Sequence, residues 1–212
     1  LNSTTALTAQ NSTGVKSLLP TTTKHFKAQL DSILSDIHID ALKIGMLSNI
    51  DILQATIEAI KKYDLKNIVV DTVLISSSGR RLSEIDAIEM FKNELFPLAD
   101  IITPNIPEIN ILLNIDYDGT GSHIESISQE LKSLKSKYIL LKGGHSTDES
   151  SAIDYLTKDG KLIKSHSANR VNTTHTHGTG CILSSAIATY LALGYPMTDS
   201  VSMAKDFLTK KL

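Results

Sequence analysis

The residues most suited to chemistry stand at Thr176–Cys181, directly before an apolar run from Ile182 to Leu191 that predicts a helix. Backbone N–H groups at a helix start lack intrahelical partners and lie at the positive end of the helix dipole. A glycine-rich start therefore predicts an anion site. Cys181, the chain's only cysteine, falls in the first turn, where the pKa of a thiol tends to drop. This suits phosphoryl or acyl transfer; the alternative is an ordinary helix start with an inert cysteine.

A second pair of functional groups is formed by Asn105 and Glu108, just past an apolar stretch that predicts a strand. An amide and a carboxylate at this spacing suit Mg²⁺ held partly through water beside a nucleotide phosphate. The alternative is local, with Asn105 capping the next helix and Glu108 closing a capping box. On these residues alone, the capping interpretation is favoured.

Two further charged residues end predicted strands. Lys142 is followed by Gly143 and Gly144, a combination that lets an ammonium and the backbone approach phosphate oxygens closely. The alternative is a tight turn with a solvated lysine. Asp71 ends another apolar strand, where it is placed either to orient Mg²⁺ or water or to cap the following segment.

The amide of Gln10 lies in Thr5–Asn11, which predicts a strand running into a polar loop. Such an amide can recognise a planar heterocycle by two hydrogen bonds, or can simply face solvent. His175 and His177 are two residues apart, but no cysteine or histidine stands at metal-ligand spacing from them. A zinc site is therefore not expected.

The elements that must position these groups alternate between strands and helices, which predicts an α/β fold with a mainly parallel sheet and helices on both faces. Ser48 is the expected cap of the first helix. Asp159-Gly160 predicts a small hairpin that extends the sheet. Ligands of such sheets gather where parallel strands end, which is where the polar residues fall. The predicted strands are 41–45, 68–71, 100–103 and 138–142, and the predicted helices begin near 48, 83, 107, 124, 178 and 197.

Composition narrows the functional classes. The 212 residues suit one domain, 1–212, and 41% hydrophobic content allows a sizeable core. A net charge of −2 gives no electrostatic footprint for nucleic acid. No apolar run approaches the length of a membrane span, and one cysteine fits a reducing compartment. A cytoplasmic protein without membrane or nucleic-acid partners is expected.

Five motifs in this order resemble the hydroxymethylpyrimidine/phosphomethylpyrimidine kinase of thiamine biosynthesis, a family within the ribokinase-like superfamily. The resemblance extends along the whole chain and implies a ribokinase-like three-layer α/β/α sandwich. A cysteine at the helix start is specific, because most ribokinase-like enzymes carry Asp there as the base. The motifs are Ala6–Asn11, Lys43–Leu47, Thr103–Glu108, Leu141–His145 and His177–Cys181.

The resemblance also implies roles. Cys181 would be the catalytic residue beside the substrate hydroxymethyl group, in an anion hole formed by Gly178, Thr179, Gly180 and Cys181. ATP and Mg²⁺ would be the cofactors and a small pyrimidine the substrate, in a homodimer. The residues implied to bind the nucleotide and metal are Lys142, Asn105, Glu108, Asp71, Ala204 and Lys205, with Glu108 and Asp71 nearest the metal. The residues implied to line the pyrimidine pocket are Gln10, Met46, Val73 and Cys181.

The chain departs from the family pattern in three places. It begins after the family's first strand, glycine-rich loop and helix, and it ends before the family's C-terminal tail. Asp71-Thr72-Val73-Leu74 replaces the usual Asp-Pro-Val-Met. The expectation is therefore a domain truncated at both ends relative to the family. Pyridoxal kinase and a non-catalytic ligand-binding fragment remain as alternatives.

Overall fold

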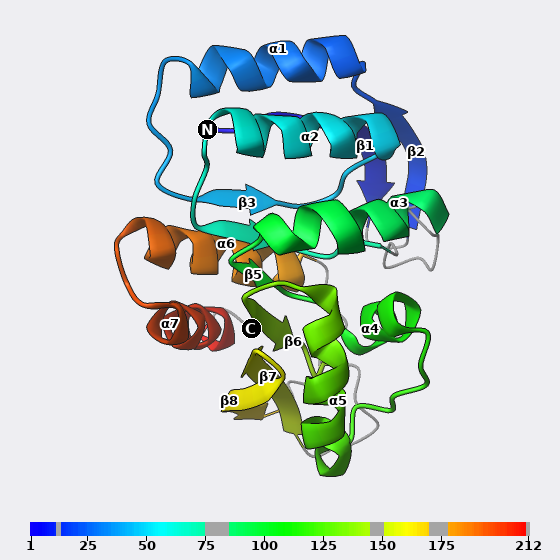
Figure 1. The fold of residues 1–212 in the computed structure, drawn as a ribbon, viewed down its shortest axis with the longest axis vertical. Coiled ribbons are helices and arrows are strands. Elements are labelled where there is room, and N and C mark those ends of the chain that lie inside the picture. Colours follow the sequence, from blue (N-terminus) through cyan, green and yellow to red (C-terminus); the bar gives the residue numbers. More distant parts are fainter. Residues whose placement is uncertain (12–13, 75–84, 145–150, 170–177, 211–212) are drawn as a thin grey trace.

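A six-stranded sheet forms the centre of the protein in the computed structural model, which describes residues 1–11, 14–74, 85–144, 151–169 and 178–210. The strand order is β3-β4-β5-β6-β7-β8 (Figure 1). β3 to β6 run parallel, and β7 and β8 add an antiparallel hairpin. The expected mainly parallel sheet with a hairpin extension is confirmed. The strands are β3 (Leu42–Ile44), β4 (Ile68–Val70), β5 (Ile101–Ile102), β6 (Tyr138–Leu141), β7 (Ser151–Lys158) and β8 (Lys161–Asn169).

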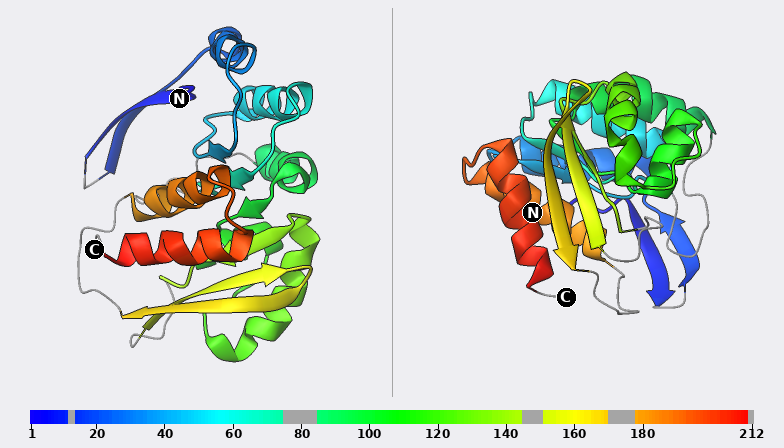
Figure 2. Two further views of the ribbon diagram at one scale, coloured as in Figure 1. Left: turned by 90° about the vertical axis from the view of Figure 1, so that its left-hand side faces the viewer. Right: turned by 90° about the horizontal axis from the view of Figure 1, so that it is seen from below.

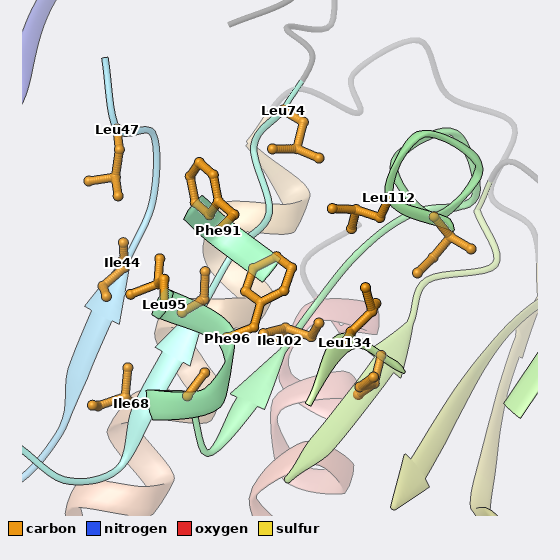
Figure 3. Packing of buried hydrophobic residues seen from close by; sticks show 14 of the residues in the cluster. Ile44, Leu47, Ile68, Leu74, Phe91, Leu95, Phe96, Ile102, Leu112 and Leu134 are labelled. Carbon is orange, nitrogen blue, oxygen red and sulfur yellow. The ribbon is translucent and has the colours of Figure 1, made fainter. Parts of the chain in front are cut away.

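Helices cover both faces of this sheet, which makes three layers (Figure 2). Because side chains alternate along a strand, one face presents Ile44, Ile68 and Ile102 to the larger core cluster (Figure 3). The other presents Val69 and Ile101 to the cluster under α6 and α7. Helices of the first face are α1 (Thr23–Leu34), α2 (Ile50–Lys62), α3 (Ile85–Met90), α4 (Ile106–Leu113) and α5 (Ile124–Leu131); those of the second are α6 (Thr179–Ala192) and α7 (Met197–Thr209).

The start of α2 corrects one sequence expectation. Asn49 caps this helix, because its side-chain oxygen accepts a hydrogen bond from the Ile52 N–H at 2.9 Å. Ser48 is not the cap: its hydroxyl donates to the Thr5 carbonyl oxygen at 3.1 Å and so ties the N-terminal segment to the loop after β3. The short amide of asparagine is as good a cap as serine, so the type of residue did not distinguish the two positions.

The helix expected over 83–96 is less regular than its hydrophobic pattern predicts. Residues 83 and 84 lie outside the described part, and α3 continues as a π-helix over Phe91–Leu95 and a 3₁₀ turn over Phe96–Leu98. Pro97 lacks an N–H and its ring clashes with a regular helical turn, so an α-helix cannot continue through it. Phe91, Leu95 and Phe96 are nevertheless buried against the sheet (Figure 3).

Two elements near the N-terminus were not among the predicted ones. β1 (Ala6–Asn11), the expected strand, pairs with β2 (Gly14–Pro20) as a separate antiparallel hairpin, and α1 follows. In α1 the buried Phe26 is followed by Leu30, Ile33 and Leu34 at helical spacing, so a sequence signal for this helix was present. Leu7 and Leu19 of the hairpin are largely exposed, at 63% each.

β3 is the end strand of the sheet, and a cavity of about 640 Å³ borders it. Lys43 and Gly45 contribute to its wall from the strand, and Ser185 and Thr189 contribute from α6. Within the part of the chain that the structure describes, no helix has both the length and the apolar character needed to cross a membrane.

Candidate active site

Asp71 is the centre of a polar cluster at the carboxyl ends of the parallel strands. It directly follows β4 and retains only 3% exposure. Its Oδ1 accepts hydrogen bonds from Lys142 Nζ at 3.1 Å and from the Thr103 hydroxyl at 3.3 Å. Its Oδ2 accepts one from the Ser184 hydroxyl of α6 at 3.3 Å. Four elements therefore meet at this carboxylate.

The backbone explains why the strand ends meet. The Asp71 N–H donates to the Ile44 carbonyl at 2.8 Å, and the Lys142 N–H donates to the Pro104 carbonyl at 2.8 Å. Asn105 and Lys142 also form a parallel bridge beyond the regular strands. Because Asp71 is two residues after Val69, it points to the α6 face, as the alternation of a strand requires.

The start of α6 lies against this cluster. A Cβ on Gly180 would lie 3.3 Å from Lys142 Nζ and 3.8 Å from both carboxylate oxygens of Asp71. Gly178 begins the helix with a φ of 84°, a conformation that favours glycine. The structure thus places Gly180 against Asp71 and Lys142, as the sequence predicts, with Cys181 next along the chain, whereas a Cβ on Gly178 would meet no atom within 4 Å. His175, His177 and Thr176 lie outside the described residues.

The thiol of Cys181 differs from its expected state. Although the residue keeps exposed surface, loss of hydration raises the pKa of the thiol above its ordinary value. The Asp71 carboxylate raises this pKa further, while the ammonium groups of Lys43 and Lys142 lower it. The prediction of a lowered pKa from the helix start is wrong, because desolvation and the neighbouring carboxylate outweigh the positive charges.

Asn105 and Glu108 form the capping box that the local interpretation predicts. The Asn105 side-chain oxygen accepts from the Glu108 N–H, and Glu108 Oε2 accepts from the Asn105 N–H, both at 2.8 Å. Glu108 Oε2 also accepts from the Thr72 hydroxyl at 3.0 Å. Burial raises the pKa of the Glu108 carboxyl, which is only 4% exposed. Thr72, the residue that departs from the family pattern, thus gains a role in holding Glu108.

The donor set of Glu108 and Asp71 fits a magnesium ion that keeps several waters. Mg²⁺ is commonly bound by one or two carboxylates together with substrate phosphates, without an all-protein cage. Among the described residues, no group of three or more His, Cys, Asp or Glu stands together as a metal site. The two buried carboxylates therefore suit Mg²⁺ that arrives with a nucleotide.

The residues expected around the pyrimidine are only partly brought together. Met46 and Val73 are half-buried and follow β3 and β4, which are neighbouring strands. The Met46 carbonyl accepts a hydrogen bond from the Thr5 hydroxyl at 2.8 Å, so the N-terminal segment reaches this end of the sheet. Gln10 is exposed on β1, in the separate hairpin, on the side to which β3 points (Figure 1).

Ala204 and Lys205 of α7 both make contacts within the protein. Ala204 is wholly buried in the smaller core cluster. Lys205 Nζ forms an ion pair with Asp154 Oδ2 at 2.5 Å, and Asp154 Oδ1 accepts from the Gly143 N–H at 2.9 Å. A contact of either residue with adenine stays a prediction. It would require Ala204 to leave the core cluster or Lys205 to leave its ion pair with Asp154. Asp154 instead links Lys205 to the Lys142–Gly144 turn.

Sequence reasoning missed Lys43 as a member of this site. Its Nζ lies 3.9 Å from Asp71 Oδ2, whereas that of Lys142 lies 3.1 Å from Oδ1. The signal was present, because Lys43 is a charged residue inside a short apolar strand. Ser184 was also missed, since the sequence does not show which partner a hydroxyl group will find.

Comparison with known proteins agrees with this geometry. A sequence model described as phosphomethylpyrimidine kinase matches residues 1–212. The chain belongs to the phosphomethylpyrimidine kinase family. It is 38% identical over 208 residues to the hydroxymethylpyrimidine/phosphomethylpyrimidine kinase of Escherichia coli K12, covering 98% of the chain and 77% of that protein. It is also 38% identical to a probable thiamine biosynthetic bifunctional enzyme of rice, again over 98% of the chain but only 38% of that longer protein.

Solved structures of this superfamily share the fold. A phosphomethylpyrimidine kinase from Clostridium difficile superposes with a TM-score of 0.84 at 37% identity, covering 100% of this chain and 85% of that one. A pyridoxal kinase from Bacillus subtilis, solved as an ADP complex, gives a TM-score of 0.83 at 28% identity, covering 95% and 74%. The ribokinase-like α/β/α fold is confirmed. The phosphomethylpyrimidine kinase family is thus the nearer match in sequence.

Proposed function

We propose that this chain carries out ATP-dependent phosphorylation of hydroxymethylpyrimidine and of its monophosphate. The observation that carries the proposal is the approach of Gly180 to Lys142 and Asp71, with a Cβ position 3.3 Å from the ammonium. A helix start, a lysine and a buried carboxylate form one cradle for phosphoryl groups. Phosphoryl transfer relies mainly on positioning and charge stabilisation, which this cradle supplies.

The start of α6 would stabilise the transferred phosphoryl group. The helical hydrogen bonds begin with the Ile182 N–H donating to the Gly178 carbonyl at 2.9 Å. The amides of Gly180 and Cys181 precede that bond and lie at the positive end of the helix. Fixed donors at this place favour the negative charge that develops during transfer.

Lys142 would pair with the nucleotide phosphates, and Asp71 would hold its ammonium in place until they bind. Glu108 and Asp71 would hold Mg²⁺ through water, and the ion would neutralise phosphate charge. The capping box orients the Glu108 carboxylate with two hydrogen bonds to Oε2, from Asn105 and Thr72. A carboxylate fixed in this way needs little reorganisation when a metal–nucleotide complex arrives.

Cys181 would accept the proton of the substrate hydroxyl in its thiolate form. Because desolvation and Asp71 raise the pKa of the thiol, this form becomes more abundant as the pH rises above neutrality. The bound substrate would lie between the thiol and the loops after β3 and β4, which carry Met46 and Val73. Gln10 would reach the pyrimidine from the β1–β2 hairpin.

The test is an ATP-dependent assay of purified protein of verified length with hydroxymethylpyrimidine, its monophosphate and pyridoxal as separate substrates. Turnover of the two pyrimidines is expected. Preferential turnover of pyridoxal would favour the second candidate, which the structural similarity to the Bacillus subtilis pyridoxal kinase supports. Absence of turnover with all three, while ATP still binds, would indicate a non-catalytic ligand-binding fragment.

We further infer from the family resemblance that the protein is a cytoplasmic homodimer. The exposed Leu7 and Leu19 on the β1–β2 hairpin supply apolar surface for such an association. Sedimentation equilibrium tests the oligomeric state, and a monomer at micromolar concentration would contradict it.

A further inference from the structure

Lys43 and Lys142 both form ion pairs with the Asp71 carboxylate, each with a different oxygen. Lys43 Nζ lies 3.9 Å from Asp71 Oδ2, and Lys142 Nζ lies 3.1 Å from Oδ1. The two lysine side chains are only 22% and 17% exposed, and that of Asp71 is 4% exposed. The Glu108 carboxyl also lies within electrostatic reach of Lys142. Lys43 stands farther from Asp71 than Lys142 does, so its ammonium is the one placed to receive an incoming anion.

Gly45 leaves the space that the Lys43 ammonium occupies. A Cβ on Gly45 would lie 2.8 Å from Lys43 Nζ, closer than real contacts allow. The backbone of Gly45 does not have the positive φ that calls for glycine. An alanine at this position would therefore displace the flexible end of the Lys43 side chain from its place.

Lys43 belongs to the substrate side of the cluster. It lies on β3, paired in register with Val69 and hence on the α6 face. Met46, expected at the pyrimidine, follows the same strand, whereas Lys142 ends β6, beside Asn105. A phosphate attached to the pyrimidine would therefore enter the cluster from the β3 side, where Lys43 lies, while Lys142 lies next to Gly180.

On the basis of the proposed function, we propose that Lys43 binds the phosphate of the monophosphate substrate and thereby serves the second phosphorylation rather than the first. Hydroxymethylpyrimidine carries no phosphate, whereas its monophosphate carries about −1.5 to −2 charges near neutral pH. The Lys43 ammonium, 3.9 Å from Asp71 Oδ2, would therefore have a phosphate partner in the second substrate and none in the first. Lys142 serves the nucleotide in both reactions.

The two phosphorylation steps differ in chemistry, so the role of Lys43 can be tested separately from that of Cys181. In the first step the hydroxyl oxygen forms a bond to the γ-phosphorus, ADP leaves with the electron pair, and the hydroxyl proton goes to the thiolate. In the second step an oxygen of the substrate phosphate forms a bond to the γ-phosphorus of another ATP, and ADP again leaves with the electron pair. With a second pKa near 6, that oxygen is already deprotonated at pH 7.5. Lys43 thus matters most for the second step and Cys181 for the first.

The experiment compares Lys43→Met with the wild type, measuring kcat/KM for each pyrimidine substrate at saturating ATP. Loss of a charge-assisted contact lowers kcat/KM for the monophosphate on the order of 10- to 100-fold, and that for hydroxymethylpyrimidine much less. The matched control is Lys61→Met, an exposed lysine in the last turn of α2, which leaves both values unchanged. Equal losses with both substrates would mean that Lys43 only balances Asp71, and would overturn the proposal.

Two further variants keep the positive charge. Lys43→Arg recovers part of the monophosphate activity. Gly45→Ala displaces the flexible Lys43 ammonium, and it lowers monophosphate activity in the same direction as Lys43→Met but less. The assigned position of the Lys43 ammonium would be contradicted if Lys43→Arg were as defective as Lys43→Met. It would also be contradicted if Gly45→Ala left the preference between the two substrates unchanged.

A binding measurement without nucleotide separates this inference from the proposed function. The monophosphate should raise the Tm of the wild type and of Lys61→Met, and should raise that of Lys43→Met markedly less. Equal shifts in all three proteins, or no shift in the wild type, would refute the phosphate contact. A wild type that binds the monophosphate but phosphorylates neither substrate would refute the proposed function alone.

Discussion

Gly143, in the turn that carries Lys142, has no room for a side chain. A Cβ at this position would lie 1.9 Å from the Ile153 carbonyl oxygen and 2.8 Å from the carbonyl carbon. These are backbone atoms of β7, so they cannot rotate away as a side chain can. At Gly144, the next residue, a Cβ would meet no atom within 4 Å. The two neighbouring glycines therefore form a matched pair for substitution by alanine.

The structure sets the expected cost of Gly143→Ala. The turn and β7 must separate by on the order of 1 Å, and overpacking of this kind costs about 1–3 kcal/mol. The same movement weakens the hydrogen bond from the Gly143 N–H to the Asp154 carboxylate, and bonds to charged groups contribute about 1.5–3 kcal/mol. With partial relaxation we expect about 3 kcal/mol of lost unfolding free energy. For a domain of this size that lowers Tm by roughly 6–12 °C.

Urea unfolding of both variants, with circular dichroism as the signal, measures this difference. Gly144→Ala should lie within about 1 kcal/mol of the wild type, on the stabilising side, because alanine restricts the unfolded chain. Gly143→Ala should also raise the KM for ATP, since the turn positions the Lys142 ammonium at Asp71. If Gly143→Ala is as stable as Gly144→Ala, the packing of the turn against β7 is not as described and the reasoning fails.

Three further predictions concern the same cluster. Cys181→Ala should lower turnover of hydroxymethylpyrimidine by roughly 10²–10⁴-fold, while ATP binding measured by calorimetry stays intact. Near-normal turnover of this variant would remove the role assigned to the thiol. In the wild type, turnover should rise from pH 7 to 9, because the pKa of the thiol is raised. Burial raises the pKa of Glu108 in the folded state, so its contribution to stability is greatest in acid and is lost as the pH rises through that pKa, by about 1.4 kcal/mol per unit of pKa difference. Metal-free urea unfolding between pH 4 and 8 should therefore show the wild type losing stability relative to Glu108→Gln, and parallel curves would contradict this. Lys205→Met leaves the Asp154 carboxylate buried without its cation and should cost about 3 kcal/mol, and adding Asp154→Asn should restore part of it; failure of the double variant to recover would argue against the pair.

The convergence of Asp71, Lys142 and Gly180 was predictable because two simple rules apply to it. Parallel strands end at one edge of a sheet, and residues two apart along a strand share a face. Apolar strands ending in a charged residue therefore predict where those charges meet. The helix start at Gly178 was equally clear, since glycine and a long apolar run mark it together.

The remaining features depend on contacts that no local pattern encodes. Ser48 and Asn49 are both good helix caps, and only the position of the Thr5 carbonyl decides between them. The pKa of Cys181 depends on how far its surroundings exclude water, which the sequence of one turn does not reveal. α1 is an exception, because Phe26, Leu30, Ile33 and Leu34 recur at helical spacing and this helix was predictable.

The placement of Lys43 inside β3 also bears on how the sheet folds. Side chains on a strand alternate between faces, so a slip of one residue in the pairing of β3 with β4 would exchange Lys43 and Ile44. The ammonium would then enter the hydrophobic core and the isoleucine would face Asp71, and both changes are strongly unfavourable. Lys43, which we assign to the substrate phosphate, thus also helps to fix the register of β3 on β4, because it disfavours misaligned pairing while the sheet assembles.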